Sequence, residues 1–437
     1  MKQTLKINRK FLRQSHLLIL LVFTTFSFAQ GQNYKMRAEE NLLFLAKDSS
    51  VLELLSLDSL GVRMFASSEE KLAGTPEIRI DWKDVGEFLK ILDEFSPKEV
   101  YDIYKGRKIS SLYFHKKEKN ERIQARKSLQ GLKVALDPGH FAGSMKEARQ
   151  EQRLMELDGS DYGVKRKLRF YEADLTYSTA LILKRKLEEA GAEVFISRPK
   201  GKSALGSTFK KWYKKEFRNV LNRDLASGEM DQETFDWWIN KATKRQIFNI
   251  YFKGKDFEAR ADHINSWRPD LTFIIHYNAD PSGNLKTYER NYCMAFVGGG
   301  FTKKELNSSE SRLEFLRLLL SEDLEQSITL SSFWVEAHKD LLNIPAVLEP
   351  NNVEYLNKYS VYTGRPGVYS RNLALSRRIH GTICYGESLL QENIHEAQAL
   401  ARKDYRDGKI KTSKRIEEVS EAYFQAVIKF YNLDLNK

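Results

Sequence analysis

At 437 residues, of which 41% are hydrophobic, the chain is long enough for one large domain with insertions or for two domains, which excludes a minimal single domain. Its formal net charge is +12 at pH 7, but the basic residues are spread along the chain without a nucleic-acid-binding signature, so we expect no nucleic-acid partner. The basic excess is compatible with an anionic envelope polymer, although an ordinary solvated surface explains it better.

Residues 1–29 predict a secretory signal peptide. Five basic residues precede the apolar run LLILLVF, and the small residues Ser27 and Ala29 prepare a cleavage site. The run is too short to span a bilayer stably, and no cysteine at the cut offers a lipid attachment point. We therefore expect export to the periplasm or the extracellular space without a stable membrane span. Removing five basic and no acidic residues lowers the formal charge from +12 to +7.

Residues 30–128 form an N-terminal region of unknown role. The stretches AEENLLFLAK and VGEFLKILDEF have helical spacing, and the basic, polar segment HKKEKNERIQARK is typical of a linker or connecting helix. No residue in this region carries recognisable chemistry. The region is therefore predicted to be small and partly helical.

From residue 129 to 437 the pattern changes to apolar strands alternating with amphipathic helices. The strand KVALD is followed by the helix ADLTYSTALILKRKLEEAG and the strand AEVFIS, and such a βαβ unit implies a parallel sheet. The apolar runs LTFII before His276 and TICYG before Glu387 predict further strands. The helical stripe of RIEEVSEAYFQAVIKFY is expected to cover one face. We therefore expect an α/β fold with a mainly parallel, twisted sheet flanked by helices.

Two long polar segments, at about residues 200–256 and 300–360, are expected to be helical insertions on this sheet. The aromatic WWIN of the first is more typical of a local core than of a sugar-binding platform. Both segments open near the edge where a site is expected, so one of them is hypothesised to gate the cleft. Deletion of residues 300–360 is then expected to raise activity.

The two cysteines, Cys293 and Cys384, lie in strand-like apolar runs. In an oxidising compartment they can form a disulfide, but buried free thiols are about equally consistent with the pattern. Their redox state stays open.

Ionisable residues follow three of the predicted strands. His140 comes after KVALD, His276 ends LTFII and Glu387 ends TICYG, while Glu172 opens the next helix on the same edge. Sites in parallel sheets form at the carboxyl ends of strands. Two imidazoles and one carboxylate are the protein ligands of a catalytic zinc site that keeps one position open for water. A further acid is then left for proton transfer.

The segment DPGH predicts how His140 is presented. Pro138 and Gly139 suit the middle of a tight turn, which lifts His140 over the sheet edge. Asp137 is expected to accept a hydrogen bond from a ligand imidazole and so fix its tautomer. Asn278 lies on the same side of an extended chain as His276 and is expected to orient water or substrate.

Each candidate has a simpler alternative. An acid in the first turn of a helix is favoured by the helix dipole, which by itself explains Glu172, and Glu387 is alternatively a surface acid at the start of a loop. Packing or capping explains Arg260 and Asn265 better than chemistry does. Rival acids lie in the loop before Glu172, but none opens an apolar-faced helix: Glu147, Glu151 and Glu156. The other histidines lie in the signal peptide, the linker, the middle of a helix or polar segments expected to be solvated: His16, His115, His263, His338, His380 and His395.

Together these segments resemble the zinc-dependent N-acetylmuramoyl-L-alanine amidases of cell-wall hydrolysis, and the similarity runs through most of residues 131–437. It covers DPGH, the Glu172 helix followed by GAEVFISR, the segment ARADHINSWRPDLTFIIHYNA, and GVYSRNLALSRR before ICYGESLLQEN. In the last segment Glu387 and Asn393 keep the spacing of the family's final glutamate and asparagine. The resemblance implies that one Zn²⁺ is bound by His140, Glu172 and His276, with Glu387 as the catalytic base.

The chain departs from the family pattern in three respects. The glycine-rich continuation after the histidine is replaced by FAGSMKEA, and the loop between His140 and Glu172 is longer than usual. Tyr277 replaces a small residue and is expected to line the cleft. These departures concern the shape of the substrate groove more than the metal site.

The resemblance implies an exported hydrolase that cleaves the amide bond between N-acetylmuramic acid and L-alanine in peptidoglycan, using a metal-activated water and a glutamate general base. Residue types alone indicate only metal-assisted amide hydrolysis. The alternatives are an envelope zinc peptidase or carboxypeptidase, and a catalytically silent cell-wall-binding or regulatory module. A regulatory protein partner, the stem-peptide preference and the oligomeric state stay open.

Overall fold

The computed structural model describes residues 32–95, 99–100, 128–165, 167–279, 290–347 and 354–433. The predicted signal peptide and the whole predicted linker HKKEKNERIQARK lie outside these residues. The chain divides into two compact units, one of Met1–Lys117 with Phe301–Glu322 and one of Glu118–Gly300 with Asp323–Lys437. Within the described part of the chain, no helix has the length and apolar character needed to cross a bilayer.

The second unit is built on a seven-stranded sheet, as the sequence predicts for an α/β fold. Its strand order is β10-β11-β9-β12-β8-β4-β7. The run from β12 to β7 is parallel throughout, whereas β9 pairs antiparallel with β12 and β10 pairs antiparallel with β11. The strand bounds are Lys133–Pro138 (β4), Glu193–Ile196 (β7), Leu271–Asn278 (β8), Met294–Gly298 (β9), Ser360–Tyr362 (β10), Val368–Arg371 (β11) and Thr382–Leu390 (β12).

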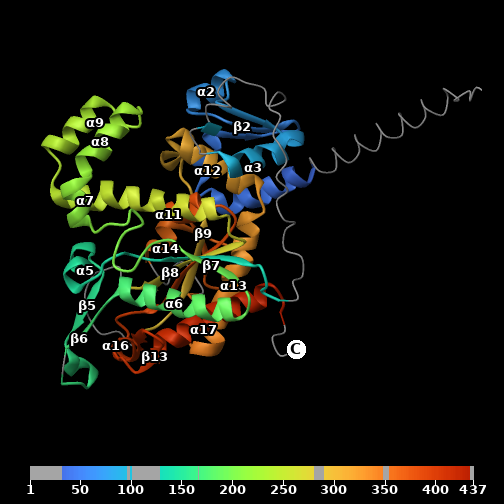
Figure 1. Cartoon of the computed structure of the whole chain (residues 1–437). Coiled ribbons are helices and arrows are strands. Elements are labelled where there is room, and N and C mark those ends of the chain that lie inside the picture. The colour runs from blue at the N-terminus through green and yellow to red at the C-terminus, as the bar shows by residue number, and fades with distance from the viewer. Residues whose placement is uncertain are drawn as a thin grey trace, which may run out of the picture. The chain divides into compact units, whose positions relative to one another are not determined.

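Helices cover both faces of this sheet, which is why β8 is buried at every position. One face is covered by three long helices, which lie close together in Figure 1: α6 (Glu172–Glu189), α13 (Asp323–Leu342) and α17 (Lys414–Phe430). The other face packs against α11 (Lys253–Trp267) and α15 (Ala374–Arg378) through one apolar cluster that includes Ala135, Ile264, Ile274 and Leu375. The carboxyl ends of the parallel strands stay at one edge between these layers.

The three-helix face packs very closely on β12 at Gly386. A Cβ atom at this position would lie 2.6 Å from the Cζ2 atom of Trp334 on α13 and 2.6 Å from the hydroxyl oxygen of Tyr423 on α17. No side chain larger than hydrogen fits there. The part of β12 that carries Glu387 is therefore packed against Trp334 of α13 and Tyr423 of α17.

The first predicted insertion is a small helical body with its own aromatic core. Figure 1 shows α7, α8 and α9 gathered at one end of α11. The cluster includes Trp212, Trp238 and Phe252, which confirms the interpretation of WWIN as part of a local core. Its elements are α7 (Phe209–Lys215), α8 (Phe217–Ala226), α9 (Gln232–Asn240), α10 (Lys244–Gln246) and the π-helix η5 (Ile247–Phe252).

Residues 300–360 do not form one insertion. The helix α12 (Ser309–Leu320) belongs to the first unit, whereas α13 belongs to the second, where Trp334 packs against Gly386 of the sheet and His338 is buried beside Trp334. The helix α14 (Glu354–Tyr359) and strand β10 follow. Deleting the whole segment would remove the core helix α13 and the first residue of the edge strand β10, so this deletion is not a clean test of gating.

The first unit contains a three-stranded antiparallel sheet that the sequence did not predict. The order is β1-β2-β3, with bounds Leu55–Leu57, Gly61–Met64 and Ile78–Asp81. The predicted helices are present over residues 32–45 and as α3 (Val85–Glu94). The remaining elements are η1 (Ser49–Glu53), α2 (Ser68–Ala73), η2 (Trp82–Asp84), η6 (Lys303–Leu306) and α12.

The long loop between His140 and Glu172 is itself structured. It holds the helix α5 (Met145–Glu151), the strand β5 (Leu154–Leu157), the short helix η4 (Gly159–Tyr162) and the strand β6 (Leu168–Tyr171), which pairs antiparallel with β5. The chain returns through this hairpin directly into α6. After β12 come α16 (Ile394–Leu400) and a hairpin of β13 (Tyr405–Asp407) and β14 (Ile410–Thr412).

Both cysteines are buried free thiols. Because Glu387 pairs with Met294, Cys293 lies opposite Ser388, four residues along β12 from Cys384. This offset is roughly 13 Å, at about 3.3 Å per residue, and exceeds the Cα separation of about 7 Å that a disulfide tolerates. The register therefore favours the free thiols over the disulfide.

Candidate functional site

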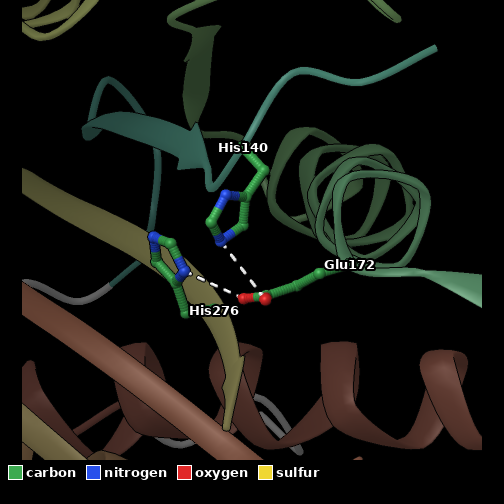
Figure 2. Close-up of side chains that lie close together, drawn as sticks. All are labelled: His140, Glu172 and His276. Carbon is green, nitrogen blue, oxygen red and sulfur yellow. Dashed lines mark hydrogen bonds and ion pairs between the residues drawn. The ribbon is translucent and has the colours of Figure 1, made fainter. Parts of the chain in front are cut away.

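The structure brings the three predicted metal ligands together at the carboxyl edge of the sheet (Figure 2). His140 follows β4, His276 lies in β8, and Glu172 is the first residue of α6. One ligand atom from each lies within 4.8 Å of the others. The Glu172 carboxylate sits between the two rings, with Oε2 3.2 Å from His140 Nε2 and Oε1 3.0 Å from His276 Nδ1.

The protonation of this group is set by burial and by mutual contact. Burial lowers the pKa of His140 to about 4, so this imidazole is neutral and offers the lone pair that a metal ligand needs. Burial favours the neutral form of Glu172, but its close contacts with the two imidazoles outweigh burial and hold the pKa of the carboxyl well below its usual range. Burial likewise opposes the charged form of His276, yet its hydrogen bond to Glu172 leaves the pKa raised.

The turn after β4 requires glycine at position 139. A Cβ atom there would lie 2.3 to 2.7 Å from three ring atoms of His276. The Gly139 N–H donates to the carbonyl of Ile275 at 2.9 Å, which ties the turn to β8. His140 then takes a left-handed backbone conformation with φ of 56°, which non-glycine residues adopt only under constraint.

Two buried arginines supply that constraint. Arg260 on α11 donates to the carbonyl oxygens of Pro138 at 2.8 Å and His140 at 3.0 Å. Arg198, which follows β7, donates to the carbonyls of Pro138 at 2.8 Å and Gly139 at 3.1 Å. Every carbonyl of the turn from Pro138 to His140 therefore accepts a hydrogen bond from a fixed guanidinium group. The sequence predicts only packing or capping for Arg260 and gives no signal for Arg198.

The predicted role of Asp137 is wrong. Asp137 is fully buried and accepts hydrogen bonds from Arg260 Nη1, at 3.1 and 3.3 Å, and from the Ser197 hydroxyl. Among the described residues no ligand imidazole donates to it. Asp137 instead neutralises Arg260, which also pairs with Asp256 at 2.8 Å, so it supports the turn through the arginine.

Glu387 lies next to His276 on the neighbouring strand. The two residues are register partners in the parallel pair of β12 and β8, so their side chains share one face of the sheet. Burial raises the pKa of Glu387 to about 7, with the negative charge of Glu172 adding to the rise and His276 opposing it. A half-buried carboxyl with a pKa near neutrality is suited to proton transfer.

The alternation along β8 separates Asn278 from Tyr277. Asn278 shares the face of His276, is 5% exposed, and its side-chain Nδ2 has no hydrogen-bond partner among the described residues. Tyr277 points to the other face, where its hydroxyl lies 2.7 Å from the Thr179 hydroxyl of α6. The expectation that Tyr277 lines the cleft is therefore wrong.

Tyr385 is a site neighbour that the sequence did not reveal. Its ring stacks on that of His276, with centroids 4.7 Å apart and planes 6° from parallel. Burial beside Glu387 and Glu172 raises the pKa of Tyr385 well above its usual value, so the phenol stays neutral. Its position two residues before Glu387 on β12 was the available signal, because such residues share a face.

Comparison with known proteins gives one family match. The family model described as N-acetylmuramoyl-L-alanine amidase matches residues 134–416. A comparison with curated proteins finds no match.

Several solved structures are similar to this chain. The CwlD amidase of Clostridioides difficile, solved in complex with the GerS lipoprotein, is 16% identical, with a TM-score of 0.38 and coverage of 69% of this chain and 99% of that chain. An N-acetylmuramoyl-L-alanine amidase of Clostridium difficile is 13% identical, with a TM-score of 0.38 and coverage of 69% and 98%. An N-acetylmuramyl-L-alanine amidase of Mycobacterium smegmatis is 13% identical, with a TM-score of 0.38 and coverage of 70% and 99%.

Proposed function

The chain belongs to the N-acetylmuramoyl-L-alanine amidase family and is an enzyme of this class, and we propose that it cleaves the bond between the lactyl group of N-acetylmuramic acid and L-alanine with a zinc ion and Glu387. The observation that carries the proposal is the meeting of His140, Glu172 and His276 at one edge, with Glu387 in register beside His276. Peptidoglycan is the substrate that this family membership implies.

The three ligand side chains fit a zinc ion. They offer two imidazole nitrogens and one carboxylate, all within 4.8 Å of one another, and this donor set leaves a position open for water. A neutral His140 and an ionised Glu172 are the protonation states that ligation requires. His276, whose pKa is raised by its hydrogen bond to Glu172, would give up its proton on binding the metal. A zinc ion held there would lower the pKa of water and polarise the amide carbonyl.

Glu387 is proposed to move the proton. As water adds to the carbonyl carbon, the Glu387 carboxylate takes one of its protons, and it then gives that proton to the nitrogen of L-alanine as the C–N bond breaks. A lactyl carboxylate and a free L-alanine amine are formed. Asn278 supports this step as a buried amide on the same face, with Nδ2 available to hold the water or the carbonyl oxygen.

Digestion of purified peptidoglycan tests the reaction. Mass spectrometry of the wild-type digest should show stem peptides with a free L-alanine terminus, and Glu387→Gln should lower turnover by about 10² to 10⁴-fold. Glu233→Gln, the same change at an exposed position of α9, is the matched control. Cleavage within the peptide would favour the peptidase alternative. Zinc binding without lysis, unchanged by Glu387→Gln, would favour the silent module.

Metal analysis tests the cofactor separately. We expect one zinc ion per chain in the purified protein, lost in His140→Ala and His276→Ala. The exposed His395 gives the control His395→Ala, which should keep its zinc. A zinc content unaffected by the two ligand variants would refute this site.

Export is also part of the proposal. The basic, apolar and small-residue pattern of residues 1–29 supports cleavage after Ala29. Sequencing the amino terminus of the protein recovered from the envelope or medium should give Gln30 as the first residue. Retention of the full amino terminus inside the cell would contradict export.

A further inference from the structure

Arg153 is held rigidly beside the metal ligands without belonging to them. It follows α5, where Gln152 takes a left-handed conformation with φ of 58°. The Arg153 N–H donates to the carbonyl of Ala148 at 3.0 Å, and its carbonyl accepts from the N–H of Glu172 at 3.2 Å. Both sides of its peptide backbone are thereby fixed, one of them to a ligand residue.

The side chain of Arg153 faces the site and remains open to solvent. Its Nε lies 3.7 Å from Glu172 Oε2, and the side chain is 47% exposed. The neighbouring arginines differ, because Arg149 and Arg169 both pair with Glu156, at 3.0 and 2.8 Å. A metal ion bound by Glu172 would use that negative charge, which would leave Arg153 as a cation available to another anion.

A second arginine, Arg371, lies on the same face of the sheet as Tyr385 and Glu387. Arg371, the last residue of β11, has its guanidinium group 5.3 Å from the ring centre of Phe296 and 5.0 Å from that of Tyr355. Within the described ranges no carboxylate pairs with it. Its positive charge acts on Glu387 and Tyr385, as that of Arg153 does. The two cations therefore influence the same group of reacting residues from different elements.

The charges around the loaded site sum to a positive value. Zinc contributes +2 and each arginine +1, while Glu172 and ionised Glu387 contribute −1 each, so the sum is +2. Half-enclosed sites with an excess of one sign attract ligands of the other. A guanidinium group also offers paired donors that match a carboxylate. An anionic substrate group near the scissile bond fits this arrangement.

We propose that Arg153 binds a free carboxylate of the stem peptide, with Arg371 adding attraction from the other side, so that the enzyme prefers acidic over amidated peptides. This inference rests on the proposed function. The residue after L-alanine lies one Cα step, about 3.8 Å, further along the peptide, and a glutamate joined through its side chain keeps its α-carboxylate free there. Amidation of that carboxylate removes the charge with little change in size.

Matched substrates test the preference. The wild type should cleave the muramoyl peptide with a free carboxylate at least about tenfold more efficiently, in kcat/KM, than its α-amide. Arg153→Ala should raise KM for the acid about tenfold and leave the amide within about threefold, and Arg153→Lys should keep part of the preference. Arg371→Ala should lower the preference for the acid less than Arg153→Ala does. The control is Arg169→Ala, because Arg169 lies on β6 of the same loop and is paired with Glu156.

If Arg153 instead only holds Glu172 in position, a different result is expected. In that case Arg153→Ala would weaken zinc binding and lower kcat on both substrates equally, which would overturn the inference. Calorimetry on Glu387→Gln separates this from failure of the proposed reaction, because binding needs no turnover. The Glu387→Gln variant, which keeps Arg153, should bind the acid peptide about tenfold more tightly than the amide. Adding Arg153→Ala to this variant should abolish the difference. Equal binding of both peptides by the parent would refute the proposal.

Discussion

Gly139 shows how closely the site is packed at the level of single atoms. The absence of a side chain there lets the turn after β4 lie directly on the His276 ring, with no intervening atom. The same approach fixes the position of His140, the next residue, relative to the second imidazole, whose ring centre is 5.0 Å away. The spacing of the two ligands therefore depends on a residue that cannot bind metal.

Gly139→Ala is expected to weaken zinc binding by about 10- to 100-fold, as loss of a supporting contact does at other metal sites, because the new methyl group must displace the His276 ring. Competition with a chromophoric chelator measures the affinity. Gly254→Ala, in α11, is the control, since a Cβ atom there meets nothing within 4 Å. Zinc affinity unchanged in Gly139→Ala would show that the ring can move at little cost.

The sequence predicted which residues meet at the site better than it predicted their neighbours. His140, Glu172 and His276 could be placed together because strand ends converge on one edge of a parallel sheet. The roles of Asp137 and Tyr277 were wrong because each depends on the partners that other elements bring to it. Arg260 and Thr179 come from α11 and α6, and no local pattern in β4 or β8 reveals them.

At the scale of elements, α11 acts on the site through one side chain. Arg260 is fully buried and joins Asp256 and Asp137 to the turn carbonyls. The nearby negative charges raise the pKa of its guanidinium group despite burial. This charge network connects the position of a helix with the conformation of the turn that carries His140.

Arg260→Lys is expected to lower the free energy of unfolding by about 3 kcal/mol, because a single ammonium group cannot reach both carboxylates and both carbonyls and leaves buried partners unpaired. Urea unfolding measures the loss, and zinc affinity should fall with it. Arg169→Lys, at an exposed ion pair on the β5–β6 hairpin, should change stability by less than about 1 kcal/mol. Equal effects of the two substitutions would contradict the role of Arg260.

The helix α13 also carries a buried ionisable residue, His338. His338 was expected to be solvated, but it is 0% exposed and packs against Trp334, with ring centres 3.8 Å apart and planes tilted by 35°. Its Nδ1 lies 2.9 Å from the carbonyl of Trp334, while Nε2 has no partner among the described residues. Burial lowers the pKa of His338 to about 3, so the folded protein holds this ring neutral.

His338 should make the fold sensitive to acid. Below the unfolded pKa of about 6.5 the unfolded chain binds a proton that the folded chain does not, so stability falls as the pH decreases from about 6.5 toward 3. His338→Leu removes this proton and should flatten the decline in unfolding free energy between pH 7 and pH 5. Urea unfolding across this range tests it, with the exposed-site variant His395→Leu as control. A slope unchanged in His338→Leu would refute the assignment.

Element prediction succeeded for long periodic segments and failed for short ones. The helices α6 and α17 were evident because their apolar stripes run over several turns. The strands β1 to β3 have three or four residues each, too few for alternation to stand out. The segment SRLEFLRLLLSEDLEQSI has continuous helical spacing, but it breaks at Ser321 and divides between the two units.

At the scale of the whole catalytic unit, the ligand set connects distant parts of the chain. His140 and His276 are separated by the β5–β6 hairpin, α6 and the aromatic helical body, yet they meet on neighbouring strands. Only the folded chain would bind an ion there, because the unfolded chain does not hold the three residues together. The proposed metal binding would thus be coupled to folding of the entire sheet.

Zinc removal is expected to destabilise the protein as a whole. At a hundredfold excess of free zinc over its dissociation constant, binding adds about 2.7 kcal/mol to stability, so chelation should lower Tm by several degrees. Differential scanning calorimetry with and without chelator measures the shift. In His140→Ala the two scans should coincide. A chelator effect of equal size in that variant would point to zinc bound elsewhere.

The aromatic residues behind Gly386 also bear on how this enzyme can change over time. Because Trp334 and Tyr423 leave no room for a methyl group at Gly386, substitutions at this position cannot be used to shift the neighbouring residue Glu387. We therefore expect changes in substrate preference to arise in other segments, such as the β5–β6 hairpin, while Glu387 keeps its place. We expect natural variants to differ most in segments that do not pack against Trp334 and Tyr423.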